Sequence, residues 1–257
     1  MGLPNLQGRT AVITGASRGI GAGLAREFAQ RGMNLALCAR GACPVPAGAE
    51  DRCLTQSVDV CDEASVQAFA DAATARFGSV DLWINNAGVL EPIAPLRELE
   101  VDAFRAHLEI NLIGVFLGTR AFVRMHRARA AAAGSPQDTC LINISSGAAW
   151  GGYAGWSAYC AGKAGVDRLT EAVQLEEAET GLRAYAAAPG VVDTAMQELI
   201  RSCSSEQFPM VDKFHEMKAA EAFNSIPFVA QHLLGYAFDP DVRPEAVCVR
   251  VPAESEA

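Results

Sequence analysis

The chain has 257 residues, of which 50% are apolar and 20% are charged, a balance typical of a globular protein and not of a disordered one. Its formal net charge of −9 at pH 7 argues against a general electrostatic affinity for nucleic acid or for an anionic membrane surface. The sequence shows no signal peptide, no apolar run of membrane-spanning length and no metal-binding cysteine motif, which favours a cytoplasmic protein with eight free thiols and no metal site.

Short apolar runs alternate with helical stretches along the chain. Because these runs lack a period of two, they predict parallel strands that are covered on both faces. The expected strands are 10–14, 34–39, 54–60, 81–85, 140–145, 183–188 and 246–251, and the expected helices are 19–31, 62–77, 101–133, 157–178 and 228–238. This alternation predicts an α/β fold, a Rossmann-type doubly wound parallel sheet with helices on both faces, in a single domain over 1–257.

Two segments break the alternation. Residues 41–52 are rich in Gly, Pro and Ala where a crossover helix is expected, so they predict a loop with at most one turn of helix. Residues 193–227 show no strand pattern and carry Phe208, Met210 and Phe214. Long segments of this kind in a compact domain are usually binding loops, so we expect a substrate lid at about 193–227.

A glycine-rich motif, TGASRGIG at residues 14–21, lies between the first expected strand and the first expected helix. Glycines let backbone N–H groups approach a pyrophosphate, and a helix N-terminus favours an anion, so this position predicts a dinucleotide-binding turn. The residues expected to contact the cofactor here are Gly15, Ser17, Arg18, Gly19, Ile20 and Gly21.

The end of the second expected strand indicates which dinucleotide binds. Enzymes that use NAD tend to place an acid there for the ribose hydroxyls, whereas this chain has Arg40. A guanidinium suits the 2′-phosphate of NADP(H), and Arg18 supplies a second cation; two solvated surface arginines are the alternative. Asp59 follows the third strand and could also serve as a helix N-cap. The contacts expected on the adenosine side are Asp59, Val60, Asn86, Ala87 and Gly88.

Tyr159 and Lys163 lie four residues apart in an expected helix and therefore share one helix face. A phenol is a poor acid–base catalyst at neutral pH, but a neighbouring ammonium favours the phenolate and lowers the pKa of the phenol. Ser146 lies thirteen residues before Tyr159, and its hydroxyl could hydrogen-bond the same carbonyl oxygen of a substrate. The three side chains suit proton transfer to or from a carbonyl or hydroxyl group, although Tyr and Lys at this spacing also occur by chance in many helices.

The ordered set of the glycine motif, the run NNAG at 85–88, Ser146, Tyr159 and Lys163 resembles the classical short-chain dehydrogenase/reductase family over about residues 7–251. The resemblance implies that Lys163 holds the ribose of the cofactor, and that Asn111 fixes a backbone kink and a relay water. The implied catalytic tetrad is Asn111, Ser146, Tyr159 and Lys163. The implied contacts at the nicotinamide end are Tyr159, Lys163, Pro189, Gly190, Val192 and Thr194.

The C-terminal half is similar to the sepiapterin reductase and benzil reductase branch of that family, through the runs GWSAYCAGK at 155–163 and APGVVDTAMQ at 188–197. Sepiapterin reductases anchor the pterin with an Asp in the last strand, where this chain has Val249 and Arg250. The resemblance therefore implies an NADPH-dependent carbonyl reductase that acts on a ketone or vicinal dicarbonyl, with Tyr159 as the general acid.

Aromatic side chains between Ser146 and Tyr159 indicate the walls of a roomy, largely uncharged substrate pocket. The expected substrate contacts are Ser146, Trp150, Tyr153, Trp156, Tyr159 and Met196. The expected partner is a small-molecule carbonyl substrate, and the resemblance implies a homodimer or homotetramer. Two other functions stay open: a dehydrogenase of another alcohol or ketone, such as a 3-oxoacyl thioester, and a non-catalytic NADP-binding sensor.

Overall fold

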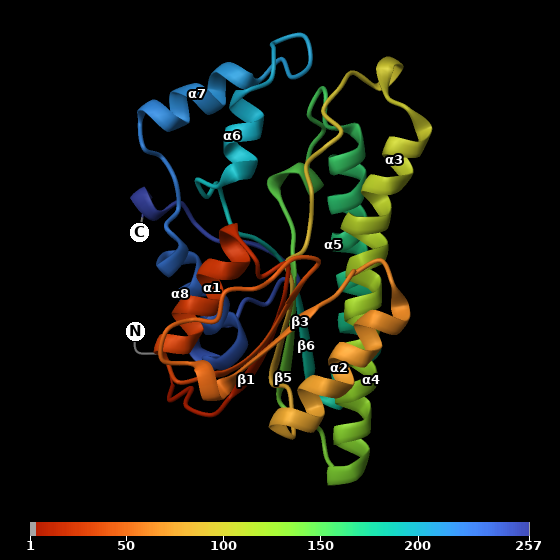
Figure 1. Cartoon of the computed structure of the whole chain (residues 1–257), viewed down its shortest axis with the longest axis vertical. Helices are drawn as coiled ribbons and strands as arrows, with labels where there is room; N and C mark the ends of the chain where they lie inside the picture. Colours follow the sequence, from red (N-terminus) through yellow and green to blue (C-terminus); the bar gives the residue numbers. More distant parts are fainter. Residues whose placement is uncertain (1–3, 257) are drawn as a thin grey trace.

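Among residues 4–256, which the computed structural model describes, seven strands form one parallel sheet. The strands are β1 (Thr10–Thr14), β2 (Asn34–Ala39), β3 (Cys53–Ser57), β4 (Leu82–Asn85), β5 (Thr139–Ile144), β6 (Leu182–Ala188) and β7 (Cys248–Arg250). Their order across the sheet is β3-β2-β1-β4-β5-β6-β7, so the winding reverses between β1 and β4 (Figure 1). This is the Rossmann-type, doubly wound single domain that the alternating pattern predicts.

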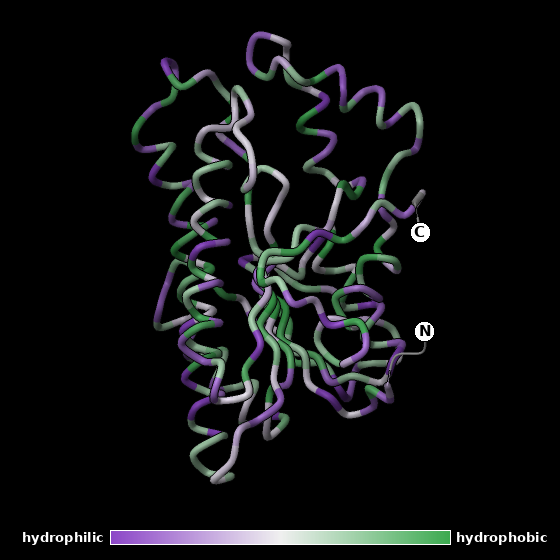
Figure 2. Tube along the Cα trace, turned by 180° about the vertical axis from the view of Figure 1, so that it is seen from behind, coloured by the Kyte–Doolittle hydropathy of each residue, from purple (hydrophilic) through white to green (hydrophobic). Residues whose placement is uncertain are grey.

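Helices cover both faces of this sheet. They are α1 (Gly19–Gln30), α2 (Glu63–Phe77), α3 (Val101–Leu108), α4 (Gly114–Ala133), α5 (Ser157–Glu177), α6 (Ala195–Arg201), α7 (Val211–Ala219) and α8 (Ile226–Phe238). On one face Phe28 of α1 and Leu233 of α8 share an apolar core, and α2, α4 and α5 cover the other face (Figure 1). Strands buried on both sides need apolar residues at nearly every position, and Figure 2 shows hydrophobic residues concentrated in the central strands.

Trp83 of β4 is the centre of the core beneath α2 and α4. Its fully buried ring packs against Phe69 and Phe122, with ring centroids 6.3 Å and 5.9 Å away. The indole Nε1 donates to Asn85 Oδ1 at 2.8 Å, and Asn85 Nδ2 donates to Asn143 Oδ1 at 2.8 Å. This buried chain of hydrogen bonds joins β4 and β5 near their carboxyl ends, which fixes the edge of the sheet from which Asn86 and Ser146 extend.

Several elements differ from the sequence-based expectation. Strand β3 ends at Ser57, because Asp59 Oδ1 accepts a hydrogen bond from the Cys61 N–H at 3.0 Å and turns the chain. The long helix carries a π-helical turn, Glu109–Ile113, between α3 and α4. Residues 193–227 hold two short helices, α6 and α7, that no periodicity predicted. The loop predicted at 41–52 is confirmed, with one 3-10 turn at Glu50–Arg52.

The helical stretch Val101–Ala133 is long and apolar enough to cross a membrane by composition alone, contrary to the expectation that no such stretch exists. Half of its most apolar window is buried inside the protein. The burial comes from packing of α4 on α2, β4 and β5. These are the contacts of a core helix in a doubly wound sheet.

Candidate active site

A cleft of about 800 Å³ opens at the carboxyl ends of the strands. Its walls come from the segments that follow β1 to β6, from the end of β7 and from helices α6 and α7. In an open α/β sheet the loops diverge where the strand order reverses, and this leaves a crevice for a ligand. The predicted dinucleotide turn and the Tyr159–Lys163 helix meet in this one cleft.

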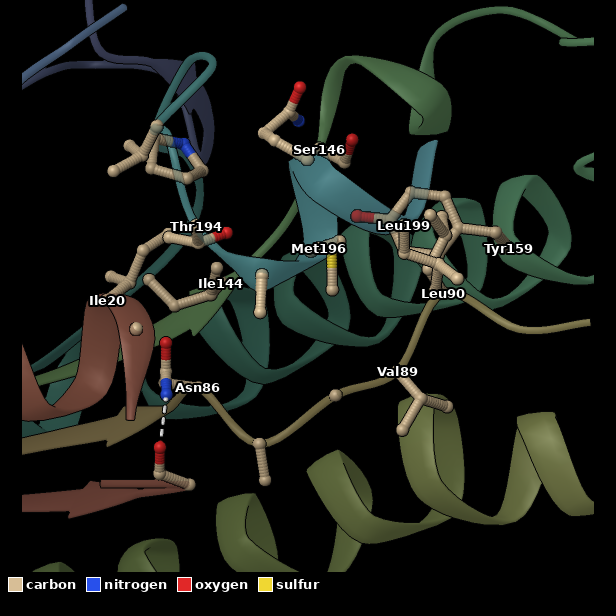
Figure 3. Close-up of a pocket in the computed structure, with 18 of the residues that line it drawn as sticks. Ile20, Asn86, Val89, Leu90, Ile144, Ser146, Tyr159, Thr194, Met196 and Leu199 are labelled. Atoms are coloured by element: carbon tan, nitrogen blue, oxygen red, sulfur yellow. Dashed lines mark hydrogen bonds between the residues drawn. The ribbon is translucent and has the colours of Figure 1, made fainter. Parts of the chain in front are cut away.

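The turn between β1 and α1 is held in place by Asn86, which follows β4. The Asn86 side-chain amide donates to the carbonyl oxygens of Thr14 at 2.9 Å and Gly15 at 3.1 Å, and a dashed line in Figure 3 marks one hydrogen bond of Asn86. In return, Thr14 Oγ1 accepts from the backbone N–H groups of Asn86 at 3.0 Å and Ala87 at 3.1 Å. Gly15 has a φ of +66°, and a Cβ there would lie 2.7 Å from the Ala87 Cα, so only glycine suits this position.

We expect Gly15→Ala to raise the dissociation constant of NADPH by about tenfold or more, because the new methyl group must displace the Ala87 backbone on the cleft wall. Gly48→Ala is the matched control, since Gly48 has a φ of +74° but a Cβ added there would meet nothing within 4 Å. Fluorescence titration of NADPH measures both. Equal affinities for the two variants would contradict the role given to Gly15.

The other residues of the glycine motif divide into two groups. Gly21, expected to touch the cofactor, does not line the cleft. A Cβ at Gly21 would lie 2.5 Å from both Asn86 Nδ2 and the Gly15 carbonyl oxygen, so this glycine permits the turn to pack. The residues that do line the cleft are Gly15, Ser17, Arg18, Gly19 and Ile20.

Arg18 and Arg40 both line the cleft and are both exposed. Within residues 4–256, neither guanidinium forms a salt bridge to a carboxylate. Asp59 lines the cleft but does not cap a helix; Asp62 is the N-cap of α2 and accepts from the Ala64 N–H at 3.1 Å. The adenosine-side residues expected from the sequence all lie on the cleft wall: Asp59, Val60, Asn86, Ala87 and Gly88.

Three features show that these residues fit a dinucleotide. The first turn of α1 carries no side-chain cap, so its N–H groups are free for an anion. Gly15 keeps the adjoining wall free of a side chain. Gln197 of α6 is only 8% exposed, lines the cleft, and has an Oε1 atom with no hydrogen-bond partner within residues 4–256. The residues expected at the nicotinamide end also line the cleft: Pro189, Gly190, Val192 and Thr194.

Strand β5 and helix α5 bring Ser146 and Tyr159 to the same part of the cleft. Ser146 follows β5 and its Oγ accepts from the Ala148 N–H at 3.2 Å, which fixes the short turn Gly147–Ala149. The Tyr159 hydroxyl points towards Ser146 (Figure 3). Hydrogen bonding to Ser146 favours the phenolate, but burial of the phenol is the larger effect and raises the pKa of Tyr159.

Lys163 lies one turn after Tyr159 and is 6% exposed. Its Nζ donates to the Ile144 carbonyl oxygen at 2.7 Å and lies 5.7 Å from the centre of the Tyr159 ring. Burial lowers the pKa of Lys163 to about 8, while Asp167 acts in the opposite direction. The net shift of the Tyr159 pKa is upward, against the expectation that Lys163 lowers it, because burial of the phenol is the largest effect.

Asn111 lies in the π-helical turn and is fully buried behind the cleft rather than on its wall. Its side chain bonds both backbone groups of Val89, accepting from the N–H at 2.9 Å and donating to the carbonyl at 2.7 Å. The π-helical turn is where the family resemblance implies a backbone kink. Asn111 also fixes the strand-end segment that carries Gly88.

His107 was missed in the sequence. It is 1% exposed, and its Nε2 lies 2.6 Å from Asn111 Nδ2, while its Nδ1 lies 2.7 Å from the Glu91 carbonyl oxygen. An amide nitrogen can only donate, so Nε2 accepts and Nδ1–H donates to Glu91, which describes a neutral imidazole. Burial lowers the pKa of His107 and supports this form. The spacing of four residues before Asn111 was the available signal.

The apolar wall of the cleft contains Tyr153, Trp156 and Met196, as expected. The Trp156 ring stacks on the fully buried Phe208, with centroids 4.4 Å apart, so the segment 193–227 supports this wall. Trp150 does not line the cleft. It is 49% exposed, and its Nε1 donates to Asp167 Oδ2 of α5 at 3.0 Å, so it is not one of the substrate contacts.

The cleft is more charged than the sequence suggested. Lys213 of α7, Arg250 at the end of β7 and Glu91 all line it. Lys213 forms no salt bridge within residues 4–256. Of the two last-strand positions compared with the pterin-anchoring Asp, Val249 is buried in the core and only Arg250 reaches the cleft.

Comparison with known proteins gives the family. The sequence model described as short chain dehydrogenase matches residues 9–204. The chain is 44% identical to cis-4-hydroxycyclohexanecarboxylate dehydrogenase of Sinomonas cyclohexanicum over 73% of this chain and 75% of that protein. It is 32% identical to the (S)-benzoin-forming benzil reductase of Bacillus subtilis over 87% and 90% of the two chains. The NADPH complex of the actinorhodin polyketide ketoreductase superposes with a TM-score of 0.77 at 25% identity, covering 95% of this chain and 96% of that one.

These relatives are named as a dehydrogenase, a reductase and a ketoreductase, and the ketoreductase structure is described with NADPH, which agrees with a family of enzymes that act on alcohol or ketone groups with a nicotinamide cofactor. With its doubly wound sheet and its Ser146, Tyr159 and Lys163 at the carboxyl edge, the chain belongs to the short-chain dehydrogenase/reductase family of oxidoreductases.

Proposed function

We propose that this enzyme is an NADPH-dependent carbonyl reductase that acts on a ketone or a vicinal dicarbonyl of the benzil type. The observation that carries the proposal is the layout of one cleft. Ser146, Tyr159 and Lys163 lie at its catalytic end, and Arg18 and Arg40 lie on the wall near the dinucleotide turn. When bound, NADPH supplies the hydride.

The protein's own residues provide binding, orientation and a proton. Because burial raises the pKa of Tyr159, its hydroxyl stays protonated near neutral pH and can donate a proton to the oxygen of a carbonyl substrate. Ser146 orients that oxygen and stabilises the charge that develops on it. The ammonium of Lys163 supports the phenolate left on Tyr159 and holds the ribose. Asn111 acts from behind the wall, by fixing the Val89 segment.

Two exposed arginines support the preference for NADPH over NADH. Arg40 follows β2, where an acid would accept hydrogen bonds from the ribose hydroxyls of NAD. A guanidinium without a carboxylate partner is available to a 2′-phosphate, and Arg18 adds a second positive charge. The structurally similar ketoreductase is described as a complex with NADPH.

The substrate class rests on the aromatic wall and on the benzil reductase relative. We expect the catalytic efficiency with NADPH to be highest for benzil, lower for isatin and lowest for sepiapterin, because Arg250 stands where a pterin-anchoring carboxylate is needed. Initial rates at saturating NADPH rank the three substrates. Sepiapterin as the best substrate would overturn the assignment.

A second candidate substrate is an oxo acid. Lys213 and Arg250 place two cations on the cleft wall, and the Sinomonas relative is named for a hydroxy acid. If this substrate is correct, Lys213→Ala raises the KM for 4-oxocyclohexanecarboxylate by about tenfold and leaves the KM for its methyl ester unchanged. Steady-state kinetics with the acid and the ester measure the two KM values. An equal change in both would exclude an ion pair between Lys213 and the carboxylate of the substrate.

We also propose an oligomeric state and a cellular location for the protein. Exposed apolar side chains on the long helices, among them Phe116 on α4 and Leu175 on α5, support a homodimer or homotetramer. The acidic composition and free thiols support a cytoplasmic location.

The segment 193–227 is proposed as the substrate lid, since its α6 and α7 line the cleft and Asp193 bonds Arg201 and Lys218 across them. A sensor role is less favoured because the cleft holds a complete Ser–Tyr–Lys set, and a 3-oxoacyl thioester is less favoured because the net charge of −9 does not suit an acyl-carrier partner.

A further inference from the structure

Asp167 is a buried carboxylate that the proposed chemistry does not use. It lies on α5, one turn after Lys163, and is 2% exposed. Its Oδ1 accepts from Ser145 Oγ at 2.5 Å, and its Oδ2 accepts from Trp150 Nε1 at 3.0 Å. A carboxylate that far from water is costly unless its oxygens are satisfied, and here each has a donor.

Both donors belong to the segment that carries Ser146. Ser145 is the first residue after β5, and Trp150 ends the turn that Ser146 caps. Asp167 therefore fastens both ends of this turn to α5, the helix that carries Tyr159 and Lys163. A third contact leads the same way, since Lys163 Nζ bonds the carbonyl of Ile144, the residue before Ser145.

We propose that Asp167 is a positioning residue, which sets Ser146 against Tyr159 through Ser145 and Trp150 and holds a negative charge behind the Lys163 ammonium. The inference rests on the proposed function only in that turnover is one of its readouts. It explains why Trp150 lies outside the cleft although it sits between Ser146 and Tyr159 in the sequence.

The titratable groups near Asp167 and Lys163 belong to α5, α3 and β7. Asp167 raises the pKa of Lys163 against the effect of burial, and Lys163 in turn lowers the pKa of His107 on α3. Burial raises the pKa of Asp167 itself, while the hydrogen bonds from Ser145 and Trp150 and the charge of Arg168 act in the opposite direction. The remaining titratable neighbours of these groups are Tyr159 and Glu171 on α5 and Cys248 on β7.

Asp167→Asn separates charge from geometry. The new amide oxygen can accept from Trp150 Nε1 while its NH₂ donates to Ser145 Oγ, so both ties remain and only the charge is lost. Ser145→Ala does the opposite, since it keeps the charge of Asp167 and removes the hydrogen bond from Ser145 Oγ. Glu176→Gln is the matched control, because it removes one charge from an exposed site on the same helix.

The test measures the pH dependence of NADPH affinity and of kcat, with thermal unfolding to verify folding. A more readily deprotonated Lys163 holds ribose and phenolate less well, so for Asp167→Asn we expect the alkaline limb of both profiles to move down by about half a pH unit or more. Ser145→Ala should lower kcat about tenfold with the limb unmoved, and Glu176→Gln should match the wild type.

Several results would overturn the proposal. One is an Asp167→Asn protein whose alkaline limbs of kcat and NADPH affinity lie at the same pH as in the wild type. Whether or not its kcat falls, that result would mean that the charge of Asp167 does not act on Lys163, as in a purely structural role. Another is a Ser145→Ala protein with wild-type kcat, and this variant also decides the matter if Asp167→Asn does not fold. The NADPH-affinity limb needs no carbonyl substrate, so the inference stands or falls separately from the proposed substrate class.

Discussion

Tyr159→Phe is expected to lower kcat for carbonyl reduction by about a thousandfold or more while NADPH binds as in the wild type. The substitution removes the hydroxyl that points towards Ser146 and keeps the ring, which packs edge-on against Trp156 at 5.6 Å between centroids. The aromatic wall of the cleft and the fold are therefore retained, so the fall in kcat measures the contribution of proton donation. Steady-state kinetics and NADPH fluorescence titration measure the two effects.

Ser146→Ala is the companion variant for this experiment. Ser146 orients the substrate oxygen and does not supply the proton, so a smaller loss, about a hundredfold, is expected. A Tyr159→Phe protein that keeps more activity than Ser146→Ala would assign the proton to another group. Two buried alternatives are Lys163, whose Nζ lies 5.7 Å from the centre of the Tyr159 ring, and His107, whose ring centroid lies 6.1 Å from that of Tyr159.

Arg40→Asp is expected to reverse the cofactor preference, with a change of about a hundredfold in the ratio of kcat/KM for NADPH to that for NADH. The variant removes a cation suited to the 2′-phosphate and places an acid at the end of β2, where it can accept from ribose hydroxyls. Arg40 forms no salt bridge within residues 4–256, so its replacement breaks no ion pair of the described fold.

Arg26→Asp is the matched control, since Arg26 is an exposed residue of α1 outside the cleft and undergoes the same change of charge. Kinetics with both cofactors at several salt concentrations separate a specific contact between Arg40 and the 2′-phosphate from a general effect of the protein's charge, because salt screens the general effect. An unchanged cofactor ratio in Arg40→Asp would show that Arg40 does not read the 2′-phosphate.

The fold was predictable because its signals are local. Each buried parallel strand needs an apolar run of a few residues, so segments such as Ile13 in β1 and Ile84 in β4 identify themselves without knowledge of their neighbours. The glycine motif and the Tyr159–Lys163 pair are likewise short patterns with fixed spacing. Because parallel strands present their carboxyl ends at one edge, their meeting in one cleft also followed from the order of the elements.

What escaped prediction depends on long-range contacts. Trp150 and Asp167 are seventeen residues apart, and nothing local shows that the indole reaches the helix rather than the cleft. The helices α6 and α7 are short, and they are held by tertiary contacts such as those of Asp193. Lys213 faces the cleft only because α7 folds over it. Periodicity could not reveal any of these placements.

The central claim, NADPH-dependent carbonyl reduction, is tested most directly by incubating the wild-type protein with benzil and each nicotinamide cofactor in turn. The near-ultraviolet absorbance of the reduced cofactor and the amount of benzoin formed are followed together. We expect one benzoin for each NADPH consumed and a much slower reaction with NADH. Tight NADPH binding without benzoin, or a faster reaction with NADH, would contradict the claim.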